Sequence, residues 1–445
     1  MAVVSSPEGS GLPCRQCGWD FQETHRFGKN HGPTAGGRSL TRTENCIDRA
    51  QGQDRIIEKA HGRRGQEPIW EFTGKKISEM ARKSPVLGER VRVALIGCGT
   101  AGVQRARCIV EDLSDQATLV VACDINEDAA RRAKESLGIE EHCKDYREVM
   151  DRKAVNAILI AVPPGLHRDI TVAAAESGKH VFCEKPIAVE LSHADEMIAA
   201  CAQANVLLMI GYQFRHSKNR AVLRELLIQG TIGRPVMWRE VLPLYAEATA
   251  QKWLWNYKLG GGSLFEYSHS IDFACYTFGQ AESVWAQLFS FREDNATEAR
   301  DSYCVNVKFE FGDVYHISGF AVLPMGMDPG TSFGGSYRLY MDDIVGGRGA
   351  VYVGPDEEGK VSMVVAEHVG GRQQKLTTPH WGTWFGGTDA DDDPAVAMFA
   401  NFFDSIRIGE LETRNSGPEA RRTLAVIQAA LESSTTGKTV CLSGG

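Results

Sequence analysis

The sequence predicts an α/β protein with a doubly wound parallel sheet, followed by an α+β domain with a large open, mainly antiparallel sheet. Between residues 90 and 210, short apolar runs alternate with helical segments, as in a parallel sheet that is covered on both faces. After residue 212, apolar and polar residues alternate with period two, as in strands with one packed face. The length of 445 residues itself suggests two or three domains.

Composition excludes several classes of protein. The chain is 43% hydrophobic and 24% charged, which is typical of globular proteins with a sizeable core. No apolar run approaches the length of a membrane span, and a net charge of −8 makes nucleic acid an unexpected partner. The 12 cysteines show no framework spacing, which indicates reduced thiols and a cytoplasmic protein.

The first 85 residues differ from the rest. They are rich in Gly, Ser, Thr, Arg and Gln, show no sustained apolar period, and lack the apolar segment of a secretory signal. We expect 1–85 to be a disordered or poorly packed extension, 86–212 to form the first folded domain and 213–445 the second. Cys14 and Cys17 lack the partner spacing of a zinc finger, so no metal is expected.

Each element of the first domain follows from its own segment. The strands are apolar runs rich in β-branched residues, and they are predicted at Val91–Ile96, Thr118–Cys123, Ala157–Val162, His180–Cys183 and Val206–Ile210. Helices are expected between them, over residues 101–113, 128–137, 167–177 and 191–204.

The second domain is predicted from alternation and from helix boundary signals. Its strands are expected at Pro235–Leu242, Ser283–Phe291, Tyr303–Phe311, Val314–Val322 and Tyr337–Met341. A helix is expected over Tyr267–Phe278. Two closing helices are predicted within 394–435, because Pro394 suits a first turn and Gly437 suits a helix end.

A glycine motif joins the first predicted strand to the first predicted helix. Gly97, Gly99 and Gly102 form G-x-G-x-x-G at this junction. In the dinucleotide-binding (Rossmann) arrangement, the first glycine permits the tight turn and the second lets the backbone approach a pyrophosphate. The third allows close packing of helix on strand, while Thr100 and Ala101 supply amides at the helix start.

The second predicted strand ends at an acidic residue. Asp124 lies 22 residues after Gly102, where it is placed to accept hydrogen bonds from the adenosine ribose hydroxyls. The next residues, Ile125 and Asn126, offer no cation to a 2′-phosphate. The sequence therefore favours NAD over NADP, which stays possible.

Two further motifs lie at the carboxyl ends of later strands, where open parallel sheets bind ligands. The segment AVPPGLH contains Pro163 and His167, and FCEKP contains Glu184 and Lys185. We expect these four residues to contact the cofactor, with the lysine beside the nicotinamide.

Four motifs occur in the same order and spacing as in a known family, and they are GCGTAG, AVPPGLH, FCEKP and GGGSLFEYSHSID. With them, residues 90–442 resemble the glucose–fructose oxidoreductase/inositol dehydrogenase (Gfo/Idh/MocA) family. The resemblance implies tightly held NAD(P), redox chemistry on sugars or polyols, and a C-terminal sheet that often forms a homo-oligomer interface. It places the family's catalytic lysine on Lys185 and its catalytic histidine on His269. One departure is Glu266, which lies three residues before His269, whereas the commonest pattern has Asp four residues before it.

These residue types suit oxidation of a secondary alcohol. The proton of the hydroxyl needs a base near neutral pH, which His269 provides, and the ammonium of Lys185 would stabilise developing alkoxide charge. Candidate substrate contacts are Tyr212 and Arg215 after the last parallel strand, and Glu266 and Asp272 around the histidine.

Two alternatives stay open at this point. An enzyme of the same fold would use bound NAD transiently for a net elimination, hydrolysis or epimerisation. A nucleotide-sensing protein would keep the fold without the chemistry, although it would have no need for both Lys185 and His269.

Overall fold

The computed structural model describes residues 90–243, 253–290, 299–320, 341–355, 361–367, 373–376 and 393–442. The predicted extension 1–85 lies outside these ranges, as does nearly all of the strand predicted at 337–341. In the part of the chain that is described, no helix is long and apolar enough to cross a membrane.

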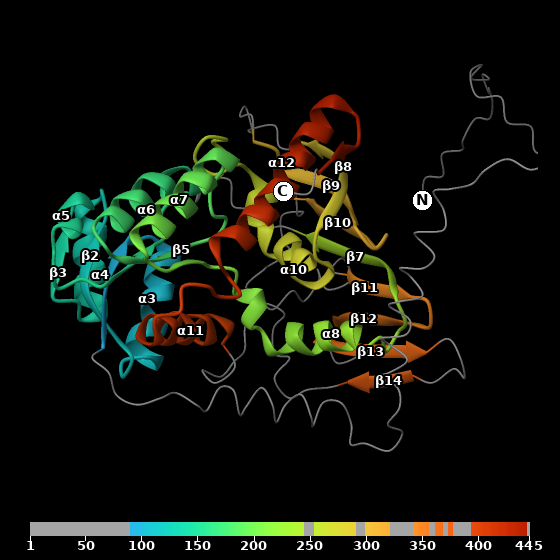
Figure 1. Ribbon diagram of the computed structural model, residues 1–445, viewed down its shortest axis with the longest axis horizontal. Helices are drawn as coiled ribbons and strands as arrows, with labels where there is room; N and C mark the ends of the chain where they lie inside the picture. Colours follow the sequence, from blue (N-terminus) through green and yellow to red (C-terminus); the bar gives the residue numbers. More distant parts are fainter. Residues whose placement is uncertain are drawn as a thin grey trace, which may run out of the picture. The chain divides into compact units, whose positions relative to one another are not determined.

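The first sheet has the predicted doubly wound parallel form. Six described strands pair in the order β3-β2-β1-β4-β5-β6, and every pair is parallel (Figure 1). They are β1 (Val91–Ile96), β2 (Ala117–Cys123), β3 (Glu141–Cys143), β4 (Ala157–Ile160), β5 (His180–Cys183) and β6 (Leu208–Ile210). The short strand β3 was not predicted, because its three residues form no apolar run.

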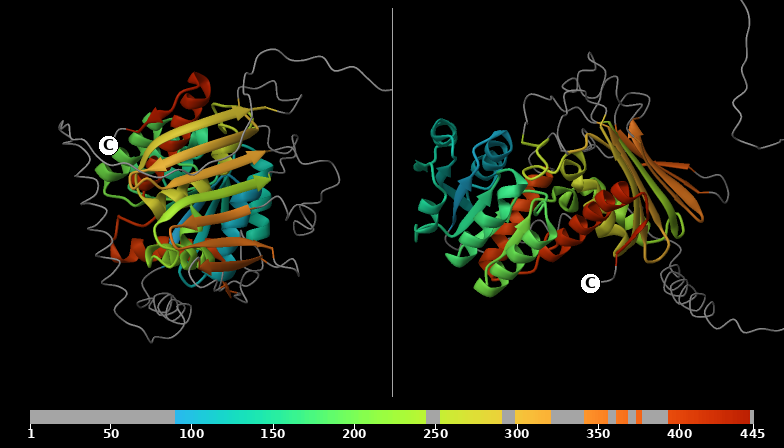
Figure 2. Two further views of the ribbon diagram at one scale, coloured as in Figure 1. Left: turned by 90° about the vertical axis from the view of Figure 1, so that its right-hand side faces the viewer. Right: turned by 90° about the horizontal axis from the view of Figure 1, so that it is seen from above.

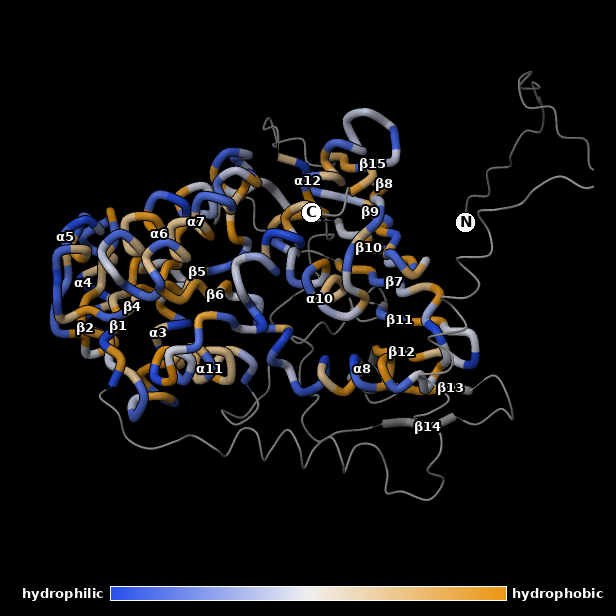
Figure 3. Tube along the Cα trace, in the orientation of Figure 1, coloured by the Kyte–Doolittle hydropathy of each residue, from blue (hydrophilic) through white to orange (hydrophobic). Residues whose placement is uncertain are grey.

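Helices connect these strands and cover both faces of the sheet. They are α3 (Thr100–Asp112), α4 (Glu127–Leu137), α5 (Arg147–Met150), the 3-10 helix η1 (Pro164–Leu166), α6 (His167–Glu176) and α7 (Leu191–Ala204). Residues of α3 and α4 join one apolar cluster with the sheet, and residues of α6 and α7 join another. Figure 3 shows the strands as hydrophobic, with hydrophilic residues on the helices around them.

The closing helix α11 (Pro394–Ile408) returns to this first sheet. Its Phe399 ring packs on Phe182 of β5 with the ring centroids 4.5 Å apart, and Phe402 lies 5.6 Å from the same ring. The carboxylate of Asp393 caps the helix by accepting a hydrogen bond from the Ala395 amide at 2.7 Å. The last helix, α12 (Gly417–Thr436), contacts both α7 and the second sheet.

The second sheet is mainly antiparallel, as predicted. Its nine described strands pair in the order β14-β13-β12-β11-β7-β10-β9-β8-β15, and only β7 and β10 run parallel. They are β7 (Pro235–Pro243), β8 (Ala281–Phe289), β9 (Ser302–Phe309), β10 (Val314–Phe320), β11 (Met341–Gly346), β12 (Gly349–Pro355), β13 (Val361–Glu367), β14 (Gln373–Leu376) and β15 (Val440–Cys441).

Helices cover only one face of the second sheet among the described residues. The 3-10 helix η2 (Gln213–His216) and α8 (Lys218–Ile228) lead into it, and α9 (Ser263–Glu266) and α10 (Ser268–Phe278) follow β7. The helix expected over 267–278 therefore begins one residue later, after a short separate turn. Figure 2 shows these helices and α12 on the inner face, with the outer face turned away from them.

Candidate active site

The three glycines of the motif are required for different reasons. Gly97 has a φ of +97°, and a Cβ built there would lie 2.3 Å from the carbonyl oxygen of Ala161. A Cβ on Gly102 would lie 1.9 Å from the carbonyl oxygen of Gly97, so this glycine lets α3 pack on β1. A Cβ on Gly99 would meet nothing within 4 Å. The space beside Gly99 is therefore open to a ligand that approaches the backbone.

The amino end of α3 is also open. Gly99 is the N-cap residue, no described side chain caps the helix, and Thr100 and Ala101 are exposed. Amides at a helix start have no partner within the helix and carry partial positive charge, which suits a phosphate. These residues therefore fit the pyrophosphate of a dinucleotide.

The carboxylate of Asp124 is fixed beside this turn. One oxygen accepts a hydrogen bond from the Cys98 amide at 2.7 Å, and the other accepts one from the Asn126 amide at 2.8 Å. The side chain stays half-buried at the end of β2, so its remaining lone pairs are available to ribose hydroxyls. The adjacent Ile125 is 85% exposed and offers an apolar surface at the same place.

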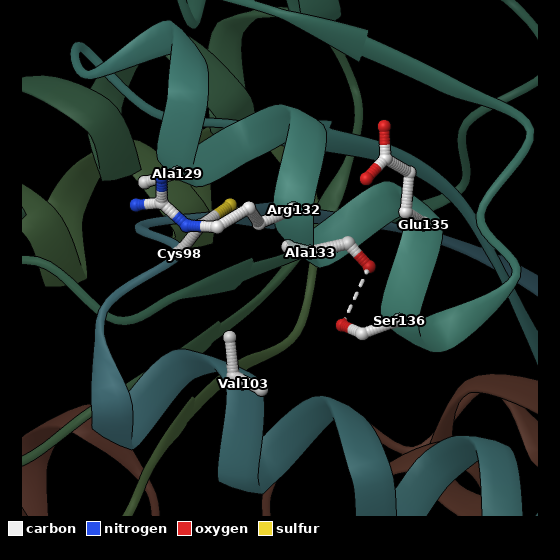
Figure 4. Close-up of a pocket in the computed structure, with 7 residues that line it drawn as sticks. All are labelled: Cys98, Val103, Ala129, Arg132, Ala133, Glu135 and Ser136. Carbon is white, nitrogen blue, oxygen red and sulfur yellow. Dashed lines mark hydrogen bonds between the residues drawn. The ribbon is translucent and has the colours of Figure 1, made fainter.

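A pocket of about 540 Å³ opens between Cys98 and the two helices α3 and α4. Figure 4 shows the side chain of Arg132, from the second turn of α4, extending toward Cys98. The sequence after Asp124 predicts no cation on this side of the glycine turn, because Ile125 and Asn126 are uncharged. Arg132 was missed because its approach depends on the packing of α4 on α3, which sequence spacing does not reveal.

His167 joins the two loops that follow β4 and β5. Its Nδ1 lies 3.0 Å from the carbonyl oxygen of Pro186, and its Nε2 lies 2.9 Å from that of Val162. The residue is fully buried, and this burial lowers the pKa of its imidazole. Pro163 is half-buried at the start of η1. The imidazole thus contacts backbone on both sides and holds the AVPPGLH loop against the EKP loop.

Glu184 is paired with a residue of the glycine-motif helix. Its carboxylate accepts a hydrogen bond from Nε of Arg105 at 2.6 Å, and both side chains are largely buried. The Lys185 amide donates to the other carboxylate oxygen at 3.2 Å. Arg105 was also missed, since a cation one turn into a helix is ordinary in sequence. The pair ties α3 to the loop that carries Lys185.

Lys185 reaches across to the second domain. Its Nζ donates to the carbonyl oxygen of Glu266 at 2.8 Å and forms an ion pair with the Glu266 carboxylate at 3.1 Å. The Lys185 side chain is 12% exposed, whereas that of Glu266 is 35% exposed. These contacts bring the ammonium to the segment that leads into α10 and His269.

His269 lies in a largely enclosed place on α10. Its ring stacks on Phe214 with centroids 4.9 Å apart, and the edge of Tyr212 lies 5.8 Å away. Burial lowers the pKa of the imidazole well below its usual value, and the charges of Lys185, Arg105 and Arg220 lower it further. Nδ1 is buried without a hydrogen-bond partner among the described residues. The imidazole is therefore neutral at physiological pH, with a lower proton affinity than the near-neutral base that the sequence predicts.

Two predicted substrate contacts are instead found paired with each other. Nε and Nη2 of Arg215 each donate to the carboxylate of Asp272 at 2.8 Å, and both side chains are buried. Thr423 of α12 donates to the same carboxylate at 3.0 Å, and Glu419 lies 3.5 Å from Arg215. Tyr212 is also buried, and Glu266 alone of the four candidates keeps a partly exposed side chain.

An open glycine turn at a parallel sheet, with a lysine and a neutral histidine nearby, is typical of nicotinamide-dependent oxidoreductases. Comparison with known proteins agrees. Residues 91–212 match the model of an oxidoreductase family with an NAD-binding Rossmann fold, and residues 221–340 match the GFO/IDH/MocA C-terminal domain. The chain belongs to the GFO/IDH/MocA family of NAD-binding oxidoreductases.

Its relatives include enzymes of known name. Myo-inositol 2-dehydrogenase of Thermotoga maritima is 30% identical over 274 residues, which are 60% of this chain and 79% of that protein. Levoglucosan dehydrogenase of Pseudarthrobacter phenanthrenivorans is 30% identical over 38% of this chain and 44% of that protein. A solved levoglucosan dehydrogenase in complex with NADH and levoglucosan superposes with a TM-score of 0.68 and 21% identity. It covers 80% of this chain and 100% of its own, which shows the shared fold.

Proposed function

We propose that this oxidoreductase transfers a hydride between NAD and a hydroxyl or carbonyl group of a sugar, polyol or related small molecule. The observation that carries the proposal is the contact of Lys185 with Glu266, which brings the ammonium of one domain to the segment that leads into the His269 helix in the other. Two relatives with inositol and levoglucosan dehydrogenase names support the substrate class. The family favours net redox chemistry over the two alternatives that the sequence left open.

The protein's own residues supply the acid–base chemistry. When NAD is bound, its nicotinamide supplies the hydride chemistry. The imidazole of His269 takes the hydroxyl proton as the alcohol becomes a carbonyl, and returns it in the reverse direction. Because Nδ1 is enclosed, this proton passes through Nε2. The ammonium of Lys185 stabilises the oxygen as negative charge develops on it.

The remaining predicted residues divide into two groups. The dinucleotide would be held by Gly97, Gly99, Thr100, Ala101, Gly102 and Asp124, with Pro163 at the same sheet edge. Glu266 is the candidate for a substrate hydroxyl, because its carboxylate is partly exposed beside Lys185. We assign His167 and Glu184 the positioning of the two loops. In the same way, Tyr212, Arg215 and Asp272 fix the surroundings of α10.

The test is a dehydrogenase assay with NAD against a library of sugars and polyols. Lys185→Met and His269→Gln should each lower kcat at least about 100-fold, in line with the loss of an oxyanion donor or a general base. The Kd of NAD should stay within about threefold of the wild-type value. Lys153→Met, at an exposed lysine, is the matched control. Unchanged turnover in either active-site variant would refute these roles.

We also propose that the protein forms a homo-oligomer through the outer face of the nine-stranded sheet. Alternation along the strands turns Met237, Trp285, Val345 and Tyr352 away from the buried inner face, and these side chains are 39–45% exposed. An apolar surface of this kind on a sheet favours contact with a partner. A cytoplasmic location stays a prediction from cysteine usage.

A further inference from the structure

We propose that Arg220 is a positioning residue for His269, acting through the Phe214 ring that both side chains contact. The inference deepens the proposed function and rests on His269 as the base. None of the three motifs that define the cofactor site contains Arg220. It lies on α8, near the start of the second domain.

The geometry links the three side chains directly. The imidazole of His269 stacks on Phe214 with an interplanar angle of 27°. The guanidinium carbon of Arg220 lies 4.3 Å from the centroid of the same ring and 5.0 Å from that of Phe273, on the His269 helix. Contacts at these distances are attractive, because the ring face is negative. The guanidinium therefore fixes the aromatic surface on which the imidazole rests.

A buried polar network holds Arg220 in place. Its guanidinium lies 3.3 Å from the carboxylate of Glu240, and both side chains are fully buried. Glu240 also accepts hydrogen bonds from Tyr315 at 2.6 Å and from Ser270 at 2.9 Å. Ser270 follows His269 in α10, so the network holds the backbone beside the imidazole as well as the ring beneath it.

A second carboxylate completes the network. Asp342 lies 3.9 Å from the Arg220 guanidinium, and one of its oxygens accepts the indole N–H of Trp238. Burial raises the pKa of Asp342 to about 8, and the charge of Glu240 raises it in the same direction. Asp342 is therefore largely protonated at neutral pH, so that Glu240 supplies the negative charge opposite Arg220 in this network.

The charge of Arg220 also acts on the imidazole. The two centroid distances place the guanidinium at most about 9 Å from the His269 ring. A charge at this separation shifts a pKa by about one unit at an effective dielectric constant of about 20. The other charged groups around this site are Lys185 and Arg105, which are paired with Glu266 and Glu184. Tyr212, whose pKa is raised by burial, stays neutral.

The experiment measures the imidazole itself. Full-length protein with labelled histidine and bound NAD is titrated by NMR from the lowest pH at which it stays folded up to about pH 8, because the pKa of His269 lies well below its usual value, and His269→Gln identifies the signal. Arg220→Met should raise the pKa of His269 by about one unit and move the acid limb of the kcat profile upward. Arg220→Lys keeps the charge and should restore most of the wild-type value. Arg224→Met is the matched control, since Arg224 lies over Tyr276 instead of Phe214.

The outcomes separate this inference from the proposed function. An unchanged His269 pKa and pH profile in folded Arg220→Met would overturn the positioning role. If that variant does not fold, the double variant Arg220→Met/Glu240→Gln removes both buried charges and is compared with Glu240→Gln alone, relative to which it should raise the pKa of His269. Phe214→Leu keeps the ion pair, removes the ring and should also raise the pKa, because the imidazole becomes better hydrated. Full activity in His269→Gln would refute the base and leave the NMR result standing.

Discussion

Substitution of Gly99 by Ala should separate cofactor binding from stability. A Cβ at this position would meet no protein atom within 4 Å, and the backbone angles of −72° and −177° are accessible to alanine. The fold should therefore tolerate the change or gain about 0.4–1 kcal/mol from the less flexible unfolded chain. The added methyl group would stand where the pyrophosphate approaches the backbone. Loss of one charged hydrogen bond there costs about 1.5–3 kcal/mol, or roughly 10- to 100-fold in Kd.

Gly102→Ala is the matched control on the same motif. Its Cβ would lie 1.9 Å from the carbonyl oxygen of Gly97, which forces α3 away from β1. Overpacking of this kind costs about 1–3 kcal/mol, so this variant should unfold at a lower temperature even without ligand. Without NAD, Gly99→Ala should therefore keep the wild-type Tm, whereas Gly102→Ala should lower the Tm.

The assay combines thermal unfolding with titration of NADH by its fluorescence. Gly99→Ala should keep the wild-type Tm without ligand and lose most of the rise in Tm that NADH produces, because that rise depends on Kd. If Gly99→Ala binds NADH with wild-type affinity, the backbone at this residue does not approach the pyrophosphate. The assignment of the motif would then be wrong.

Two other predictions concern the second domain. The folded pKa of Asp342, about 8, exceeds its unfolded value, so its contribution to stability is complete in acid and declines as pH rises toward 8. In denaturant titrations, the free energy of unfolding of the wild type should therefore fall by about 1.4 kcal/mol per pH unit between pH 6 and 8 because of this group. Asp342→Asn should not show this fall. Equal slopes of the free energy of unfolding against pH in both proteins would contradict the prediction. Trp285→Glu, on the outer face of the nine-stranded sheet, should lower the mass of the assembly measured by sedimentation. Ile408→Glu, at an exposed residue of α11, should not change it. A monomeric wild type would exclude the proposed interface.

Much of the first domain is predictable because its signals are local. The runs VRVALI and HVFC have the same bounds in the sequence prediction and in the structure, since apolar β-branched residues end at glycine or at a charged residue. The ends of the predicted strands likewise indicate where the glycine motif and Lys185 lie in the sheet. Strand β3 was not predicted, because its three residues form no apolar run, whereas helix α8 was missed although Leu223, Leu226 and Leu227 have helical spacing.

The side-chain pairs of the site were not predictable in this way. Arg215 and Asp272 are 57 residues apart and each suits a substrate contact by position, yet they neutralise each other in the interior. A buried charge without such a partner would cost several kcal/mol, so the fold requires the pair wherever both are enclosed. Local spacing carries no information about which distant charge becomes the partner.

The same reasoning explains how the protein keeps His269 neutral. Each cation that lowers its pKa has a glutamate partner: Lys185 with Glu266, Arg105 with Glu184, and Arg220 with Glu240. Each glutamate offsets part of the positive potential at the imidazole, so the cation and its partner influence the pKa in opposite directions. A glutamate-to-glutamine change should lower the pKa of His269, and a cation-to-methionine change should raise it. Burial is the largest cause of the lowered pKa of the base, and three ion pairs from different elements modify it, which explains why no single motif encodes its proton affinity.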